Sequence, residues 1–107
     1  DKKREIFKVL FLDKANRILA EDDLFEGTVD EAAIHPREVV KSALEHHATA
    51  IVLVHNHPSG RVEPSREDRE ITTKLQAACS AVSIKVIDHI IVGDNQYFSF
   101  RERNLIS

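Results

Sequence analysis

Hydrophobic and polar positions divide the chain into short extended segments separated by two amphipathic stretches. Residues 6–12, IFKVLFL, are rich in large apolar and β-branched types, which is typical of a strand. The turn-prone tetrapeptide DKAN (13–16) and the irregular alternation of RILAEDDLFEG, ended by Gly27, predict that the first two strands form a hairpin. Residues 49–54 are apolar on both faces, which favours a central strand of a sheet.

Two segments have the spacing of helices. The first begins at 35–38, where Pro36 fits the first turn, and its apolar stripe consists of Val39, Val40, Ala43 and Leu44. The second begins near Ser65, and its apolar face consists of Ile71, Leu75, Ala78, Cys79 and Val82. Residues 84–93 and 96–100 predict a closing hairpin. The order β-β-α-β-α-β-β predicts an α/β fold, a mixed sheet with helices packed on it.

Composition limits the classes of protein. A chain of 107 residues with 42% hydrophobic and 31% charged residues fits one soluble globular domain. The formal net charge is −3, so the chain does not have the excess of basic residues that is typical of nucleic-acid-binding domains. No apolar run approaches the roughly 20 residues that a membrane helix needs. Because the chain opens on Asp1 and not on Met, we expect a fragment of a longer protein.

Cys79 is the only cysteine, which excludes an internal disulfide and agrees with a cytoplasmic location. Its place on the apolar face of a helix favours simple core packing. One cysteine also disfavours a zinc nucleobase deaminase, which needs a Pro-Cys-x-x-Cys segment.

The stretch HNHPSG (55–60) directly follows the central strand. Side chains two positions apart on an extended backbone point to the same face, so His55 and His57 project together. Two imidazoles and a carboxylate from another element make a catalytic zinc site with one open position. Asp68, in the first turn of the second helix, is placed at the same edge of the sheet.

A structural alternative exists for the carboxylate. Ser65 and Asp68 have the spacing of a helix capping box, with Asp in place of Glu. On spacing alone, capping is the favoured role of Asp68, and an isolated His-x-His on a strand is more often ordinary polar surface or core. The two roles are easier to combine for Ser65 than for Asp68.

The segments HNHPSG and EPSREDR resemble the JAMM motif, His-x-His-Pro followed by Ser-x-x-Asp, of the JAB/MPN metalloprotease superfamily. With HPREVV upstream and DHIIVGD downstream, the chain looks like the RadC branch over nearly its whole length. The resemblance implies a cytidine-deaminase-like α-β-α sandwich. It also implies one JAB/MPN domain over residues 1–107 and an N-terminal helix-hairpin-helix-type region outside this fragment.

The resemblance also implies roles for individual residues. His55, His57 and Asp68 are expected to bind Zn²⁺, with water as the fourth ligand. Glu5, just before the first strand, matches the general base of the superfamily, and Glu38 and Glu26 are the alternatives. Ser65 matches the motif serine, which is expected to stabilise the oxyanion of the tetrahedral intermediate.

The remaining polar residues near the motif carry weaker expectations. Gly60 is expected to allow a backbone conformation closed to other residues. Asp88-His89 either orients a ligand ring or is ordinary polarity at a strand end. Asn56 has no assigned role, and the other histidines are expected to be peripheral, namely His35, His46 and His47.

Two classes of function follow from these expectations. The first is a zinc-dependent metallopeptidase or other hydrolase of the JAMM type, acting on an unidentified peptide or isopeptide substrate. The alternative is a non-catalytic or DNA-metabolism-associated module with a metal-binding site, because RadC proteins carry a DNA-repair label. In that case the N-terminal region would be the better DNA binder. No membrane partner is expected.

Overall fold

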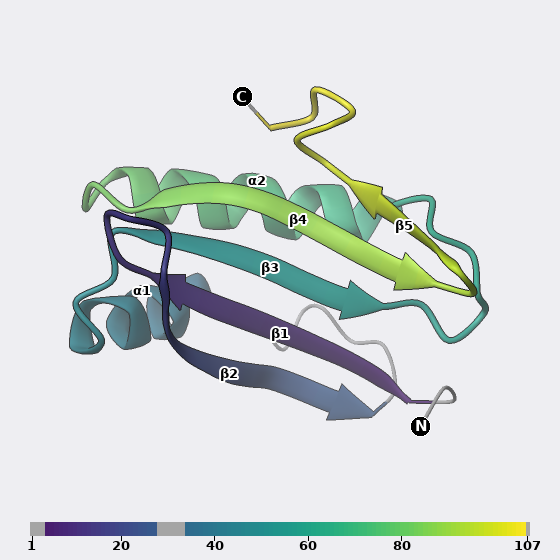
Figure 1. Ribbon diagram of the computed structural model, residues 1–107, viewed down its shortest axis with the longest axis horizontal. Coiled ribbons are helices and arrows are strands. Elements are labelled where there is room, and N and C mark those ends of the chain that lie inside the picture. Colours follow the sequence, from purple (N-terminus) through teal and green to yellow (C-terminus); the bar gives the residue numbers. More distant parts are fainter. Residues whose placement is uncertain (1–3, 28–33, 107) are drawn as a thin grey trace.

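The computed structural model describes residues 4–27 and 34–106. Five strands form one twisted sheet in the order β2-β1-β3-β4-β5 (Figure 1). Their bounds are β1 (Glu5–Leu12), β2 (Ile18–Gly27), β3 (Ala50–Asn56), β4 (Lys85–Gly93) and β5 (Gln96–Ser99). Strands β3 and β4 run parallel, whereas the other neighbours are antiparallel, so the predicted mixed sheet is confirmed.

The two predicted helices are α1 (Pro36–Glu45) and α2 (Arg66–Ser80). Both lie behind the sheet in Figure 1 and contact each other, so the described residues supply a sheet and one helical layer. Residues at alternate positions of β1 and β3 form the face under the helices and are fully buried, namely Phe7, Val9, Phe11, Ile51 and Leu53. This arrangement is compatible with the expected JAB/MPN sandwich.

Two element boundaries and one predicted buried position differ from the sequence prediction. Strand β3 continues through Asn56, two residues beyond the predicted end, because it pairs with β4 as far as Val92. Helix α2 ends at Ser80, so Val82 lies outside it and is 40% exposed. Leu44 is 51% exposed, and the buried residues of α1 are Val39 and Ala43. The predicted apolar stripes were therefore too wide at the C-terminal end of each helix.

The register between β1 and β3 brings the start of the chain to the histidines. Phe7 pairs with His55, and the same antiparallel register continued outward puts Glu5 opposite His57. The N-terminal end of β1 and the C-terminal end of β3 therefore meet at one edge of the sheet. No helix within residues 4–27 and 34–106 is long and apolar enough to cross a membrane.

Candidate metal centre

Side chains from three elements converge at this edge of the sheet. Glu5 comes from the start of β1, His55 from the end of β3 with His57 directly after that strand, and Asp68 from the first turn of α2. Ligand atoms of Glu5, His55 and His57 all lie within 4.8 Å of one another. The structure thus brings together the predicted base and the predicted histidine ligands.

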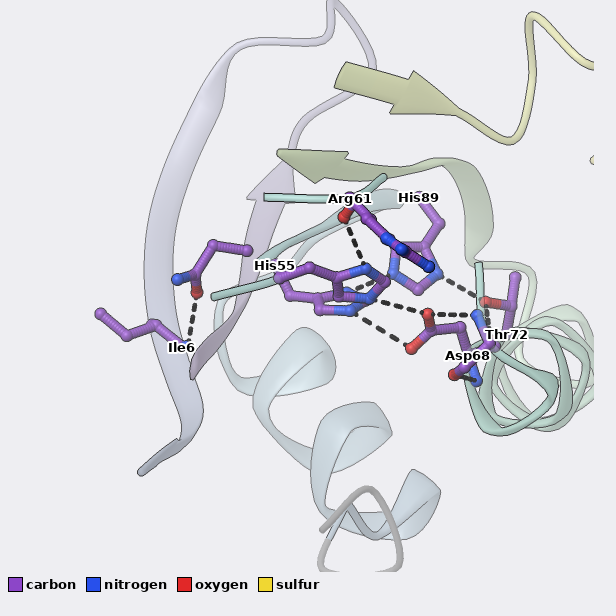
Figure 2. A network of polar contacts seen from close by, with 9 residues as sticks. Ile6, His55, Arg61, Asp68, Thr72 and His89 are labelled. Atoms are coloured by element: carbon purple, nitrogen blue, oxygen red, sulfur yellow. Dashed lines mark hydrogen bonds and ion pairs between the residues drawn. The ribbon is translucent and has the colours of Figure 1, made fainter. Parts of the chain in front are cut away.

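Asp68 lies between the two imidazole rings and the helix (Figure 2). Its Oδ1 is 3.2 Å from Nε2 of His55, and its Oδ2 is 3.0 Å from Nε2 of His57. Asp68 and His55 are 0% and 1% exposed. The two rings therefore present the same nitrogen to one buried carboxylate.

The main chain fixes the tautomer of His57. Its Nδ1 lies 3.0 Å from the carbonyl oxygen of Arg61, and a carbonyl only accepts, so Nδ1 carries a proton. In the neutral ring, Nε2 then has a lone pair directed at Asp68. A lone pair and a carboxylate oxygen at hydrogen-bond distance repel each other unless a cation or a proton lies between them. This contact suits a metal ion.

A tight turn holds His57 in place. The N–H of His57 donates to Val92 on β4, and the N–H of Gly60 donates to the carbonyl of His57. Gly60 has a φ of +87°, and a Cβ added there would meet Oδ2 of Asp94 at 2.5 Å. The expected glycine-specific conformation is confirmed, and it reverses the chain directly after the second histidine.

Asp68 also caps helix α2, which corrects the expectation that capping and facing the histidines are hard to combine. The N–H of Ser65 donates to Oδ2 of Asp68 (2.8 Å), and the N–H of Asp68 donates to Oγ of Ser65 (3.0 Å). Each carboxylate oxygen has several lone pairs, so Oδ2 accepts from the cap while Oδ1 faces His55. The capping box orients this carboxylate toward the rings.

Glu5 is a buried acid at the rim of the cluster. It is 2% exposed, and its Oε2 has no hydrogen-bond partner among the described residues. Burial raises the pKa of this carboxyl, and the neighbouring His55 partly opposes the rise. Of the alternatives, Glu38 is exposed on α1, and the side chain of Glu26 lies outside the described residues. Glu5 is therefore a buried residue and not a solvated residue at a frayed terminus.

Asn56, which had no assigned role, holds the backbone on both sides of Glu5. Its Oδ1 accepts from the N–H of Ile6, and its Nδ2 donates to the carbonyl of Arg4, both at 2.7 Å. The side-chain amide thus continues the β1–β3 ladder where β3 itself turns away. Asn is depleted in strands, and its presence at a strand end was the one signal that sequence analysis could have used.

His89 contacts the ring of His55, which agrees with the first of the two roles left open for the Asp88-His89 pair. Its Nε2 is 2.8 Å from Nδ1 of His55, and its Nδ1 is 2.6 Å from Oγ1 of Thr72. Burial, and then the neighbouring His55, lower the pKa of His89 to about 3. Asp88 has a different role, because its carboxylate accepts from Ser99 and from the main chain of Arg101. The other histidines are exposed as expected, namely His35, His46 and His47.

These features define a mixed α/β domain with a buried histidine and carboxylate cluster that could hold a metal ion. Two imidazole nitrogens and carboxylate oxygens are a donor set that zinc commonly takes in enzymes. Comparison with known proteins agrees with this class. The chain matches the RadC-like JAB domain over residues 1–105 and belongs to that family.

Similar curated proteins carry the name UPF0758. The chain is 52% identical over 106 residues to the UPF0758 protein of Vibrio atlanticus (strain LGP32), covering 99% of this chain and 47% of that protein. The UPF0758 protein of Nitrosococcus oceani is 56% identical over 102 residues, covering 95% of this chain and 46% of that protein. The corresponding protein of Pasteurella multocida (strain Pm70) is 49% identical over 106 residues, covering 99% and 47%. The chain thus spans about half the length of the curated relatives it matches.

Proposed function

We propose that this domain is a zinc-dependent hydrolase of the JAMM type that cleaves amide or isopeptide bonds. In this proposal His55, His57 and Asp68 hold the zinc ion, and Glu5 is the general base. The observation that carries it is the pair of Nε2 atoms that lie 3.2 and 3.0 Å from the two oxygens of one carboxylate. A carboxylate whose two oxygens each face the Nε2 atom of one imidazole is an arrangement that a shared cation stabilises.

The donor set fits zinc. Three protein ligands of the His and carboxylate types leave one position open, as in other hydrolytic zinc sites. When bound, zinc supplies Lewis-acid chemistry, polarising a carbonyl and making a nearby water molecule easier to deprotonate. Glu5 is close enough to the site to act as a base there, because one of its carboxylate oxygens lies within 4.8 Å of a ring nitrogen of each histidine.

Glu5 would move the protons of the reaction. A water oxygen adds to the carbonyl carbon of the substrate while a water proton passes to the Glu5 carboxylate. The same proton then passes to the amine nitrogen as the C–N bond breaks, which returns Glu5 to its starting form. A pKa raised by burial makes the Glu5 carboxylate a stronger base, which suits the uptake of a proton from water.

Ser65 is proposed to donate to the oxyanion that forms at the carbonyl oxygen. Its Oγ accepts from the N–H of Asp68, and that bond does not use the hydroxyl proton. One hydroxyl can therefore cap the helix and still donate to a substrate oxygen.

The proposal is tested by assaying zinc-loaded and metal-free protein against peptide and isopeptide libraries. We expect zinc-dependent turnover that is lost in Asp68→Ala and in Glu5→Gln, with zinc retained only in Glu5→Gln. No zinc-dependent turnover, together with zinc binding by Asp68→Ala equal to that of the wild type, would rule out the proposal. Association with DNA metabolism, through a region outside this chain, and a cytoplasmic location stay predictions.

A further inference from the structure

A hydrogen-bonded chain runs from one candidate zinc ligand to another through residues that the proposed reaction does not use. It begins at Nδ1 of His55, passes Nε2 and Nδ1 of His89, and reaches Oγ1 of Thr72, with separations of 2.8 and 2.6 Å. It ends where Oγ1 of Thr72 lies 2.7 Å from the carbonyl oxygen of Asp68. Figure 2 shows His89 between the His55 ring and Thr72 on α2.

The hydrogen bond between Thr72 and the carbonyl of Asp68 fixes the direction in which all the hydrogen bonds of this series donate. A carbonyl oxygen only accepts, so the Thr72 hydroxyl donates its single proton to Asp68. The hydroxyl oxygen must then accept from Nδ1–H of His89. A neutral His89 with a proton on Nδ1 has its lone pair on Nε2, which accepts from Nδ1–H of His55. His55 is then left with an unprotonated Nε2.

The opposite direction fits the geometry less well. It would put a proton on Nε2 of His55, whose contact with Oδ1 of Asp68 at 3.2 Å lies at ion-pair distance but does not have hydrogen-bond geometry. It would also take the Thr72 proton away from a well-placed carbonyl. Because His89 is 0% exposed and Thr72 is 2% exposed, water cannot readily supply the missing partners.

We propose that His89 and Thr72 are positioning residues that hold His55 as the Nδ1–H tautomer, with its Nε2 lone pair directed at the metal position. The inference rests on the proposed function, because this tautomer matters where His55 binds a metal. His57 needs no such chain, since a main-chain carbonyl sets its tautomer directly. The ring of His55 is buried and stacks on Phe7 at 4.9 Å, and among the described residues its Nδ1 contacts a side-chain acceptor, Nε2 of His89.

The test compares Thr72→Val with Thr72→Ser and Thr73→Val. Thr72→Val keeps the side-chain shape and removes the hydroxyl, whereas Thr72→Ser restores the hydroxyl. Thr73→Val is the matched control, because Thr73 also donates to the carbonyl four residues earlier, at 3.0 Å, but is exposed. His89→Phe removes the acceptor itself and keeps an aromatic ring against Phe100.

Two readouts decide the inference. Imidazole ¹⁵N spectra of the metal-free protein should show His55 with its proton on Nδ1 in the wild type and a mixture of tautomers in Thr72→Val. Zinc competition with a chromophoric chelator should show about 10–100-fold weaker binding for Thr72→Val and His89→Phe, and wild-type binding for Thr72→Ser and Thr73→Val. Circular dichroism confirms that each variant is folded.

A wild-type His55 with its proton on Nε2 would overturn the inference. So would zinc binding by Thr72→Val as tight as that by Thr73→Val. A wild type that binds no zinc would overturn the proposed function instead, and the tautomer in the metal-free protein would still decide the inference.

Discussion

Asp68 has a capping role and a proposed ligand role, and two substitutions separate them. Ser65→Ala removes the hydroxyl oxygen that accepts from the N–H of Asp68 and leaves the carboxylate in place. Asp68→Asn keeps an oxygen that can accept from the N–H of Ser65 but removes the negative charge. We expect Ser65→Ala to lose stability and keep zinc, and Asp68→Asn to keep most of its stability and lose zinc.

The magnitudes follow from the capping geometry. Loss of an N-cap oxygen costs about 1 kcal/mol of unfolding free energy. Loss of a negative charge in the first turn of a helix costs about 0.3–1 kcal/mol. For a chain of 107 residues, 1 kcal/mol corresponds to about 4 °C in Tm. Without zinc, both variants should therefore unfold within a few degrees of the wild type.

The rise in Tm on addition of zinc should distinguish the two variants. At a free zinc concentration of about 100 times the wild-type Kd, binding adds about 2.7 kcal/mol, or about 11 °C. Ser65→Ala should show nearly this whole shift. If the loss of the carboxylate weakens binding by about 100-fold, Asp68→Asn should gain only about 0.4 kcal/mol, or about 2 °C.

The assay is thermal unfolding followed by circular dichroism or calorimetry, because the chain has no tryptophan to report unfolding. Glu5→Gln is the matched control, since it removes the other buried carboxylate of the cluster. It should keep the zinc shift if Glu5 is a base. A full zinc shift in Asp68→Asn and none in Glu5→Gln would refute the reasoning and make Glu5 the third ligand.

Three further predictions follow from single side chains. The metal-free protein should lose stability as pH falls below about 6.5. Burial lowers the pKa of His89 to about 3 in the folded protein, so below pH 6.5 the unfolded chain binds a proton at His89 that the folded protein does not. At pH 5 the loss of unfolding free energy amounts to about 2 kcal/mol. In His89→Gln, the unfolding free energy measured with urea should therefore fall less between pH 7 and pH 5, and a fall equal to that of the wild type would contradict the lowered pKa of His89. Asn56→Ala should speed amide hydrogen exchange of Ile6 by on the order of tenfold, with Val9 as the internal control, and equal protection of Ile6 would count against the bridging amide. Cys79 is buried and burial raises the pKa of its thiol to about 11, so thiol reagents at pH 7 should label it only after unfolding; fast labelling of folded protein would contradict its burial.

The sequence predicted the parts of the site that depend on periodicity. Alternation along a strand put His55 and His57 on one face, and the position of Asp68 in the first turn of a helix brought it to the same edge. The fold class followed from the order of the elements, and the glycine-specific turn at Gly60 followed from the motif. All of these are short-range properties of the chain.

The remaining features depend on register and packing, which a single sequence does not encode locally. Asn56 reaches the backbone beside Glu5 only because Phe7 pairs with His55. The contact between Thr72 and His89 requires α2 to lie over β4 at one rotation about its axis. Sequence spacing made capping and a contact with the histidines look hard to combine for Asp68, because spacing treats a carboxylate as one group, whereas its two oxygens have different partners here.

The zinc-edge X-ray absorption spectrum of the zinc-loaded domain tests the ligand set most directly. The account predicts one zinc ion bound by two imidazole nitrogens at about 2.0–2.1 Å and by oxygen donors, with one oxygen lost in Asp68→Asn and none lost in Glu5→Gln. A spectrum without two imidazole contributions, or one that Asp68→Asn leaves unchanged, would contradict it.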